Sequence, residues 1–410
     1  MTFYLKTDIL TVGDIMKKRY IIIFIIIIIV INTSIIFLMN YKSKDIKPKT
    51  VPKLYINTSN EINDNYSNIK LDIIDNNKKI NYNNVKIKLR GHITRYEEKH
   101  PFTIKFDKKT KLFNLTESKK YVLLANTFDV TLMRNKLVYD FASKTSIKYT
   151  VKSTYVDLYI NNNYIGNYLL CDKISVDKDK INIDKNKDYL IELETPLDRN
   201  NDIYIYSKIN NWRFRIKSPK NINSKQKKKL QLLLNNTEKI IESNNYKDIS
   251  KHIDIQSFVD SYIIQEYFKN VDCNISSLYF YFKDNKLYAG PAWDFDQSMG
   301  LSEDKEYNNG FGKSYEGLYC NKNIYEKLLK NKEFKKEVIK RYNNLQKHIK
   351  NTYKKDIPNN YIMYKDTYLK NGCLWKKDIA CREQDYQARI NYIKKWLKNR
   401  NKWLLNYYKL

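Results

Sequence analysis

The sequence predicts an α+β fold whose first half is rich in strands and whose second half is rich in helices. Apolar and polar residues alternate in short segments between residues 53 and 216, as they do in half-buried strands. From residue 224 onward, apolar residues recur at the three- and four-residue intervals of amphipathic helices. A hairpin pattern between residues 278 and 290 interrupts the helical half. Strands first and helices afterwards are an α+β arrangement.

The strands are predicted from alternation and from the turn residues between them. Gly91 permits a turn after one strand, and Asn161 and Asn162 suit the positive φ of a tight hairpin turn. The predicted strands are Ile69–Ile73, Val85–Leu89, Phe102–Phe106, Tyr121–Ala125, Tyr155–Ile160, Tyr164–Leu170, Asp188–Leu193, Trp212–Ile216, Leu278–Phe282 and Leu287–Gly290.

The helices are predicted from apolar periodicity and from residues that cap helix N-termini. Asp129 is expected to cap a helix that ends near Lys144, and Ser224 to cap a helix that covers residues 230–241. Asp254 or Ser257 starts a helix that ends at residue 268, and the chain is mostly helical from about residue 324. The last helix, about 386–408, is apolar on one face and basic elsewhere. That pattern fits a packed terminal helix with a basic outer face, or a helix that binds a membrane or a partner.

The N-terminal region predicts a membrane segment. Residues 20–39 form an apolar run about long enough to cross a bilayer, and basic residues precede it. The positive charge favours a cytoplasmic N-terminus at residues 1–19 and an exported domain. The run is either an uncleaved single-pass anchor or a signal sequence. Residues 40–53 follow as a polar linker, and the folded region is expected at 54–385, with a basic C-terminal helix at 386–410.

Composition excludes several classes of protein. The formal net charge is +30, but no compact nucleic-acid-binding motif occurs, so no nucleic-acid partner is expected. The five cysteines are too scattered for a disulfide framework, although Cys373 and Cys381 lie close enough in sequence to pair. The four histidines are isolated, which gives no indication of a zinc site.

Residues 270–300 contain the candidate catalytic and metal-binding residues. Asp272 stands on a polar loop, a hairpin follows, and the chain then reaches Asp294 and Asp296 on either side of Phe295. A kinase uses the same layout for its catalytic-loop aspartate and its Mg²⁺ ligands. Two carboxylates beside Phe295 suit one or two Mg²⁺ ions.

Three further residues complete this interpretation. Counting five residues onward from Asp272, as from the aspartate to the asparagine of a kinase catalytic loop, reaches Ser277, and Asn274 is also available as a metal ligand. Lys105, in the middle of a predicted strand, is the best lysine to contact nucleotide phosphates. A P-loop and a GxSxG elbow are absent from the sequence, whereas a pair of glycosidase-type carboxylates remains open.

Four stretches of the sequence resemble the CotH kinases, a family named for a spore coat protein H. The resemblance spans about residues 85–300 and continues more weakly to the C-terminus. The four stretches are Lys88-Leu-Arg-Gly with Pro101-Phe-Thr-Ile-Lys-Phe; Lys120-Tyr-Val-Leu-Leu-Ala-Asn with Thr131-Leu-Met-Arg-Asn; Val156-Asp-Leu-Tyr-Ile with Gly166-Asn-Tyr-Leu-Leu; and Leu287-Tyr-Ala-Gly-Pro-Ala-Trp-Asp-Phe-Asp.

The resemblance implies an atypical protein kinase with a two-lobed fold, a strand-rich N-lobe and a helical C-lobe. It implies transfer of phosphate from ATP, with Mg²⁺, to Ser or Thr of Ser-rich proteins of the spore coat or cell envelope. Asp272 is then the catalytic-loop carboxylate and Asp294 or Asp296 the metal ligand. Lys105 is the nucleotide contact, and Arg90 and Asp172 are placed with it. Arg134 and Asn135 also belong to family motifs, and Arg134 could be structural.

The sequence departs from the family pattern at two of these positions. Asp172 stands where the family usually has Glu, and Ser277 stands where Asn is often found. The alternative is therefore a pseudokinase that keeps the fold and acts as a structural or assembly protein of the spore coat or envelope. Two locations are also possible: the chain is either a membrane-anchored protein with an extracytoplasmic domain or a protein of the spore coat.

Overall fold

A computed structural model describes residues 46–91, 93–194, 202–301 and 314–410. The predicted N-terminal segment at 1–19, the apolar run at 20–39 and the first part of the predicted linker at 40–53 lie outside these ranges. Within the described ranges, no helix has both the length and the apolar character that a membrane crossing requires. Residues from Lys49 onward form one compact unit, to which the rest of the description refers.

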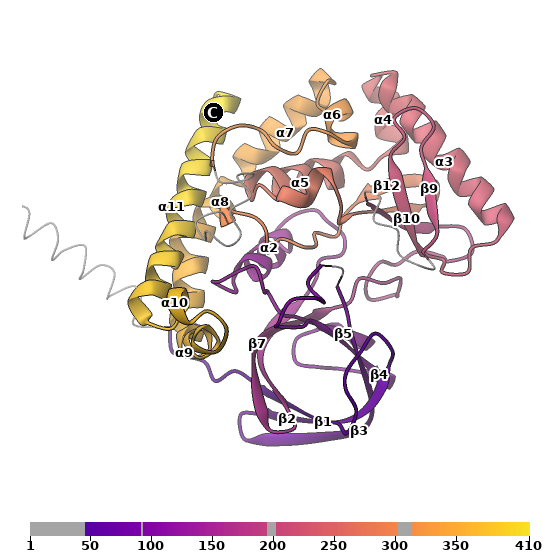
Figure 1. The fold of residues 1–410 in the computed structure, drawn as a ribbon. Coiled ribbons are helices and arrows are strands. Elements are labelled where there is room, and N and C mark those ends of the chain that lie inside the picture. Colours follow the sequence, from indigo (N-terminus) through magenta and orange to yellow (C-terminus); the bar gives the residue numbers. More distant parts are fainter. Residues whose placement is uncertain (1–45, 92, 195–201, 302–313) are drawn as a thin grey trace, which may run out of the picture. The chain divides into compact units, whose positions relative to one another are not determined.

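Seven strands of the first half close into a barrel, which Figure 1 shows in indigo to magenta. The first strand closes the barrel because it pairs antiparallel with the second and parallel with the sixth. The interior is filled by apolar side chains that alternate with outward-facing polar ones, among them Leu54, Ile87, Ile104 and Leu170. In barrel order the strands are β1 (Lys53–Asn57), β2 (Ser67–Asp75), β3 (Lys78–Leu89), β4 (Phe102–Thr110), β5 (Ser118–Leu124), β7 (Asn163–Asp172) and β6 (Ser153–Ile160).

A second, five-stranded sheet holds the remaining strands. Its order is β12 (Lys286–Ala289), β11 (Leu278–Lys283), β8 (Tyr189–Leu193), β10 (Arg213–Ser218) and β9 (Tyr204–Tyr206). The predicted hairpin is confirmed: β11 and β12 pair antiparallel around Asp284 and Asn285, which both have positive φ. Asn161 and Asn162 form the same kind of turn between β6 and β7.

The second half is helical apart from that hairpin, so the predicted α+β class is confirmed. Helix α5 is the central element, since nearly all of its residues are buried, including charged ones. The helices are α2 (Arg134–Ala142), α3 (Ser224–Glu242), α4 (Tyr246–His252), α5 (Ile255–Tyr267), α6 (Ile324–Leu328), α7 (Lys332–Asn344), α8 (Gln346–Asn351), α9 (Ile357–Trp375), α10 (Lys377–Ala380) and α11 (Glu383–Tyr408), with a 3₁₀ turn η1 (Val271–Asn274) and a π-helical turn η4 (Thr352–Asp356).

The predicted helix starts were partly wrong. Asp254 does cap α5, because its side chain accepts a hydrogen bond from the Ser257 amide. The cap of α3 is Asn223 and not Ser224, which is the first helical residue. Helix α2 begins at Arg134, five residues after the predicted cap Asp129, because the intervening segment is a turn that the Asp129 carboxylate stabilises.

Helix α9 connects the helical half to the barrel. The Asn371 amide oxygen accepts hydrogen bonds from the Asn167 amide of β7, at 3.0 Å, and from the buried Lys99 ammonium, at 2.8 Å. The Trp375 indole donates to the carbonyl of Ile165. Burial lowers the pKa of Lys99 to about 7, although its ammonium also donates to two backbone carbonyls.

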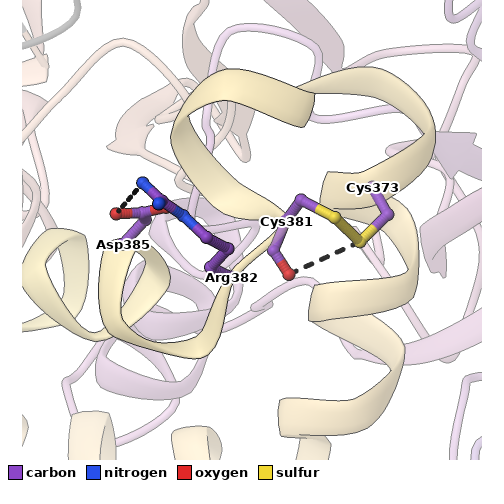
Figure 2. The surroundings of a disulfide bond; sticks show 4 residues. All are labelled: Cys373, Cys381, Arg382 and Asp385. Carbon is purple, nitrogen blue, oxygen red and sulfur yellow. Dashed lines mark hydrogen bonds and ion pairs between the residues drawn. A yellow bond between two sulfur atoms is a disulfide. The ribbon is translucent and has the colours of Figure 1, made fainter.

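A disulfide between Cys373 and Cys381 fastens the end of α9 to the segment between α10 and α11 (Figure 2). The pairing that the sequence allowed is thus present, while Cys171, Cys273 and Cys320 are free and buried. Helix α11 begins three residues before the predicted start and packs its apolar face into the core, with Ile390, Trp396 and Leu404 buried. Its basic residues are not all on the outer face, because Arg400 is fully buried.

Candidate active site

A cavity of about 590 Å³ lies where the barrel, the second sheet and the segment from Asp272 to Gln297 meet. Its walls come from the ends of β3 and β5 and the loops that follow them, from β8 and β10, and from the two acidic segments that flank the β11–β12 hairpin. This volume is in the range of small-molecule and cofactor sites.

The 3₁₀ turn η1 presents Asp272 to the cavity. The side chain of Asn270 caps the turn by accepting a hydrogen bond from the Asp272 amide at 3.1 Å, and the Asp272 carbonyl accepts from the amides of Ile275 and Ser276. The Asp272 carboxylate itself accepts no hydrogen bond from any described residue. Burial, followed by the negative charge of Asp294, raises its pKa to about 7.

The loop after the hairpin presents Asp294 and Asp296 on the same side of the cavity. Asp294 has a φ of +65° and Ser277 a φ of +61°, a region that non-glycine residues rarely occupy. The Ser277 hydroxyl donates a hydrogen bond to the Asp294 carboxylate at 3.1 Å, so the two strained residues hold one another. Such strain accumulates at functional sites, where the surrounding structure maintains it.

Two polar residues at the start of α2, Arg134 and Asn135, fix the position of the loop that carries Asp294 and Asp296. The Asn135 amide oxygen accepts a hydrogen bond from the Phe295 amide at 2.8 Å, and its NH₂ donates to Asn126. Arg134 forms a buried ion pair with Asp129 and also donates to the carbonyl of Ser298 at 2.8 Å. Arg134 therefore has the structural role that the sequence left open, and Asn135 supports the acidic loop directly.

The carboxylates on this side of the cavity destabilise one another's charged forms. Burial, and then the charges of Asp294 and Asp272, raise the pKa of Asp296 well above its usual range. Within the part of the chain that the structure describes, no group of three or more His, Cys, Asp or Glu side chains is arranged to hold a metal ion by itself. Mg²⁺ is commonly held by one or two protein carboxylates, together with water and substrate phosphates. A cation bound there would relieve the repulsion between the carboxylate of Asp294 and those of Asp272 and Asp296.

Cations line another part of the same cavity. The guanidinium of Arg90 lies 5.4 Å from the ring centroid of Trp293, and Lys217 forms an ion pair with Glu192 at 3.0 Å. Lys173 has no ion pair, and its ammonium donates no hydrogen bond to any described residue. Burial, and then the charge of Arg90 and three lysines, hold the pKa of Lys173 well below its usual range. A partly buried cation with cations around it is placed to receive an anion.

Five of the eight residues predicted from the sequence line the cavity: Arg90, Asp272, Ser277, Asp294 and Asp296. The other three lie elsewhere. The Lys105 ammonium extends outside the barrel and lies 5.4 Å from the ring centroid of Tyr66. Asp172 is fully buried and accepts hydrogen bonds from the amide and hydroxyl of Thr116, and Asn274 is bonded to the backbone of Tyr319 and Lys322.

Several charged cavity residues were not singled out from the sequence, among them Lys173, Glu192 and Lys217. Lys173 was noted only as the neighbour of Asp172, and the ion pair between Glu192 and Lys217 was not anticipated. A signal exists for Glu192, because the other residues of its strand β8 are apolar or aromatic, whereas β10 carries Arg213 and Arg215 besides Lys217. Charged residues inside buried strands are rarely tolerated unless they are paired.

The fold and the cavity define an α+β protein that sets a carboxylate cluster and a cluster of cations around one cavity. A model of the family described as CotH kinase protein matches residues 87–404, which is most of the chain. The chain belongs to this family, as the resemblance indicated. Comparison with curated proteins gave no match.

Proposed function

We propose that the chain is an ATP- and Mg²⁺-dependent protein kinase that phosphorylates Ser or Thr hydroxyls. The observation that carries the proposal is that one cavity holds Asp272 and Asp296, whose charged forms are destabilised by desolvation and neighbouring carboxylates, together with Lys173, whose charged form is destabilised by desolvation and neighbouring cations. Family membership supports the same class of reaction. In this interpretation the barrel and the second sheet correspond to the strand-rich lobe of a kinase and the helices to its C-lobe.

The cavity has groups for each part of a metal-bound nucleotide triphosphate. Asp294 and Asp296 would hold Mg²⁺, with Ser277 orienting Asp294 through its hydroxyl. Lys173 and Arg90 would neutralise phosphate oxygens, a role that the sequence had assigned to Lys105. When bound, MgATP supplies the phosphoryl group and a leaving oxygen whose charge the metal neutralises.

Asp272 would act as the group that accepts the substrate's proton. The bond between the γ-phosphorus and the β–γ bridging oxygen breaks, a bond from the substrate hydroxyl oxygen to phosphorus forms, and the hydroxyl proton passes to the Asp272 carboxylate. With a pKa of about 7, Asp272 is partly protonated near neutral pH. Activity is therefore expected to rise with pH around pH 7. A nearby Mg²⁺ stabilises the carboxylate and so shifts this rise in activity to lower pH.

The substrates proposed are Ser-rich proteins of the spore coat or cell envelope. The N-terminal apolar run at 20–39 would anchor the chain in a membrane, with the kinase domain outside the cytoplasm; the alternative is a protein of the spore coat. A reporter fused after Leu410 distinguishes an exported domain from a cytoplasmic one.

Radiolabel transfer from ATP to a serine-containing peptide tests the proposal. Asp272→Asn is expected to reduce transfer by about 10²- to 10⁴-fold, the range for loss of a general base. Asp366→Asn is the matched control, because it makes the same change at an exposed position on α9. Transfer that is unaffected by Asp272→Asn would exclude this residue as the base.

Thermal unfolding with and without MgATP separates the kinase from the structural alternative. Ligand at about 100 times its Kd stabilises the native state by about 2.7 kcal/mol. Binding without transfer would indicate a pseudokinase, a possibility that the position of Asp172 favours, since its carboxylate contacts Thr116 and not a lysine. Neither binding nor transfer would leave a structural or assembly role.

A further inference from the structure

Four lysines lie in one row across the outside of the barrel. Lys86 of β3 is directly opposite Lys105 of β4, and Lys105 is directly opposite Lys120 of β5. Tyr121 pairs with Asp172, the last residue of β7, so the residue opposite Lys120 in the same register is Lys173. We refer to Lys86, Lys105, Lys120 and Lys173 as the lysine row. Neighbouring strands are about 4.8 Å apart, so the row spans about 14 Å.

The lysine row has no acidic partners. None of its four ammonium groups forms an ion pair or donates a hydrogen bond to a described residue. Other barrel lysines behave differently: Lys79 pairs with Asp72 at 3.0 Å, and Lys109 pairs with Asp177 at 2.8 Å. Like charges that face one another across strands are destabilising, and no carboxylate within the described chain pairs with these lysines to offset that cost.

Lys173 connects the row to the candidate active site. It lines the cavity, whereas Lys105 and Lys120 do not. Burial, and then the neighbouring cations Lys220, Lys105 and Lys88, lower the pKa of Lys120, which shows that positive charge continues beyond the cavity. One phosphate group cannot contact ammonium groups spread over about 14 Å, so the shape and charge of the row fit an extended polyanion.

We propose that the lysine row binds a segment of the protein substrate that already carries phosphate monoesters, with Lys86, Lys105 and Lys120 as its principal contacts and Lys173, at the cavity end of the row, also facing the nucleotide. This inference rests on the proposed kinase function and extends it to the substrate. Alternate residues of an extended chain are about 7 Å apart, so three phosphoserines at alternate positions match the length of the row. A phosphate monoester carries nearly two negative charges at neutral pH, and lysine binds it as a point charge. The product of one transfer thereby helps to hold the substrate for transfer to a neighbouring hydroxyl.

Binding of a labelled peptide, followed by fluorescence anisotropy without ATP, tests the lysine row directly. The probes are a serine peptide and the same peptide with three phosphoserines at alternate positions. The variant replaces Lys86, Lys105 and Lys120 by Gln. The control replaces Lys225, Lys227 and Lys228 by Gln, which removes the same charge from exposed positions on α3.

The wild type and the α3 control are expected to bind the phosphopeptide at least ten-fold more tightly than the unmodified peptide. The row variant is expected to lose that preference. Equal binding of both peptides by the wild type, or equal losses in the row variant and the α3 control, would overturn the proposal. Because this assay contains no ATP, it gives an answer even if the protein proves not to transfer phosphate.

The KM for MgATP shows whether the lysine row binds phosphate groups of the protein substrate or those of the nucleotide. If the row serves the substrate, the row variant keeps the KM for MgATP within about two-fold of the wild type and of the α3 control. A ten-fold rise in that KM, with no loss of phosphopeptide binding, would instead assign the row to the nucleotide and overturn the proposal. Thermal unfolding verifies that both variants are folded.

Discussion

Two buried carboxylates in the helical half and the cavity carboxylates Asp272 and Asp296 have opposite electrostatic environments. Glu266 of α5 is almost fully buried, and its carboxylate accepts hydrogen bonds from the amides of Tyr319 and Cys320 and forms an ion pair with Arg400. Asp260 is likewise paired with Arg341 at 2.7 Å. Asp272 and Asp296 are also desolvated, yet their strongest described neighbours are other carboxylates.

This difference separates groups that hold the fold together from groups that are positioned for a ligand. A buried ion pair whose charges are fully matched adds little net stability to the fold. Removing one of its members is costly, because the other charge is left buried and uncompensated. A buried charge without a partner weakens the empty protein and strengthens binding of an opposite charge. Lys173, which desolvation and neighbouring cations destabilise in its charged form, is a similar case with the opposite sign.

The largest effect is expected at Glu266. Glu266→Gln leaves Arg400 buried without a counter-charge and turns an amide NH₂ toward donors, so it should lower the free energy of unfolding by about 3–5 kcal/mol. Asp296→Asn is the matched control in the cavity and should cost less than about 1 kcal/mol, since it removes repulsion. Urea unfolding without metal measures both. Equal losses for the two variants would show that the comparison is false.

The next effect concerns the junction between α9 and α11. The disulfide between Cys373 and Cys381 closes a short loop, for which the chain-entropy relation gives about 2.5 kcal/mol. Because α9 also holds Asn167 and Lys99 of the barrel half through Asn371, loss of the bond should loosen that contact. Hydrogen exchange at α9 in the Cys373→Ser variant should increase, with Cys320→Ser as a control that leaves the disulfide intact. Unchanged exchange would show that the polar contacts suffice.

A further effect, spread over about three pH units, is expected from the titration of Asp272. The pKa of Asp272 is raised from 3.8 to about 7, so between these values the folded state keeps a proton that the unfolded state has released. The free energy of unfolding therefore falls as pH rises from about 4 to about 7, by at most about 1.4 kcal/mol per pH unit for one proton. Thermal unfolding of metal-free protein between these limits measures the slope. Asp272→Asn should flatten it, and an identical slope in the variant would contradict the raised pKa.

The sequence was sufficient for most strands, for the hairpins and for the acidic segments, because these depend on local alternation, turn residues and spacing; the short strands β1 and β9 were not predicted. Closure of the barrel could not be predicted, since it depends on β1 pairing with β6, about a hundred residues later in the chain. The sequence also could not predict the roles of Lys105 and Lys173. Both project outward at the same register, and only the packing of the second sheet determines which of them lines the cavity.

The smallest effect is expected at Ser277, where the family often has Asn. Ser277 sits at a φ of +61°, which Asn tolerates better than most residues, so Ser277→Asn should change the free energy of unfolding by no more than about 0.5 kcal/mol. An amide oxygen is also a Mg²⁺ ligand, and Ser277 now offers only a hydroxyl that is donated to Asp294. Mg²⁺ titration in the presence of ATP should therefore show tighter binding in the variant, with Ser276→Asn, one residue earlier, as control. Weaker Mg²⁺ binding in Ser277→Asn would mean that the hydrogen bond to Asp294, and not a ligand at position 277, is what orients the metal site.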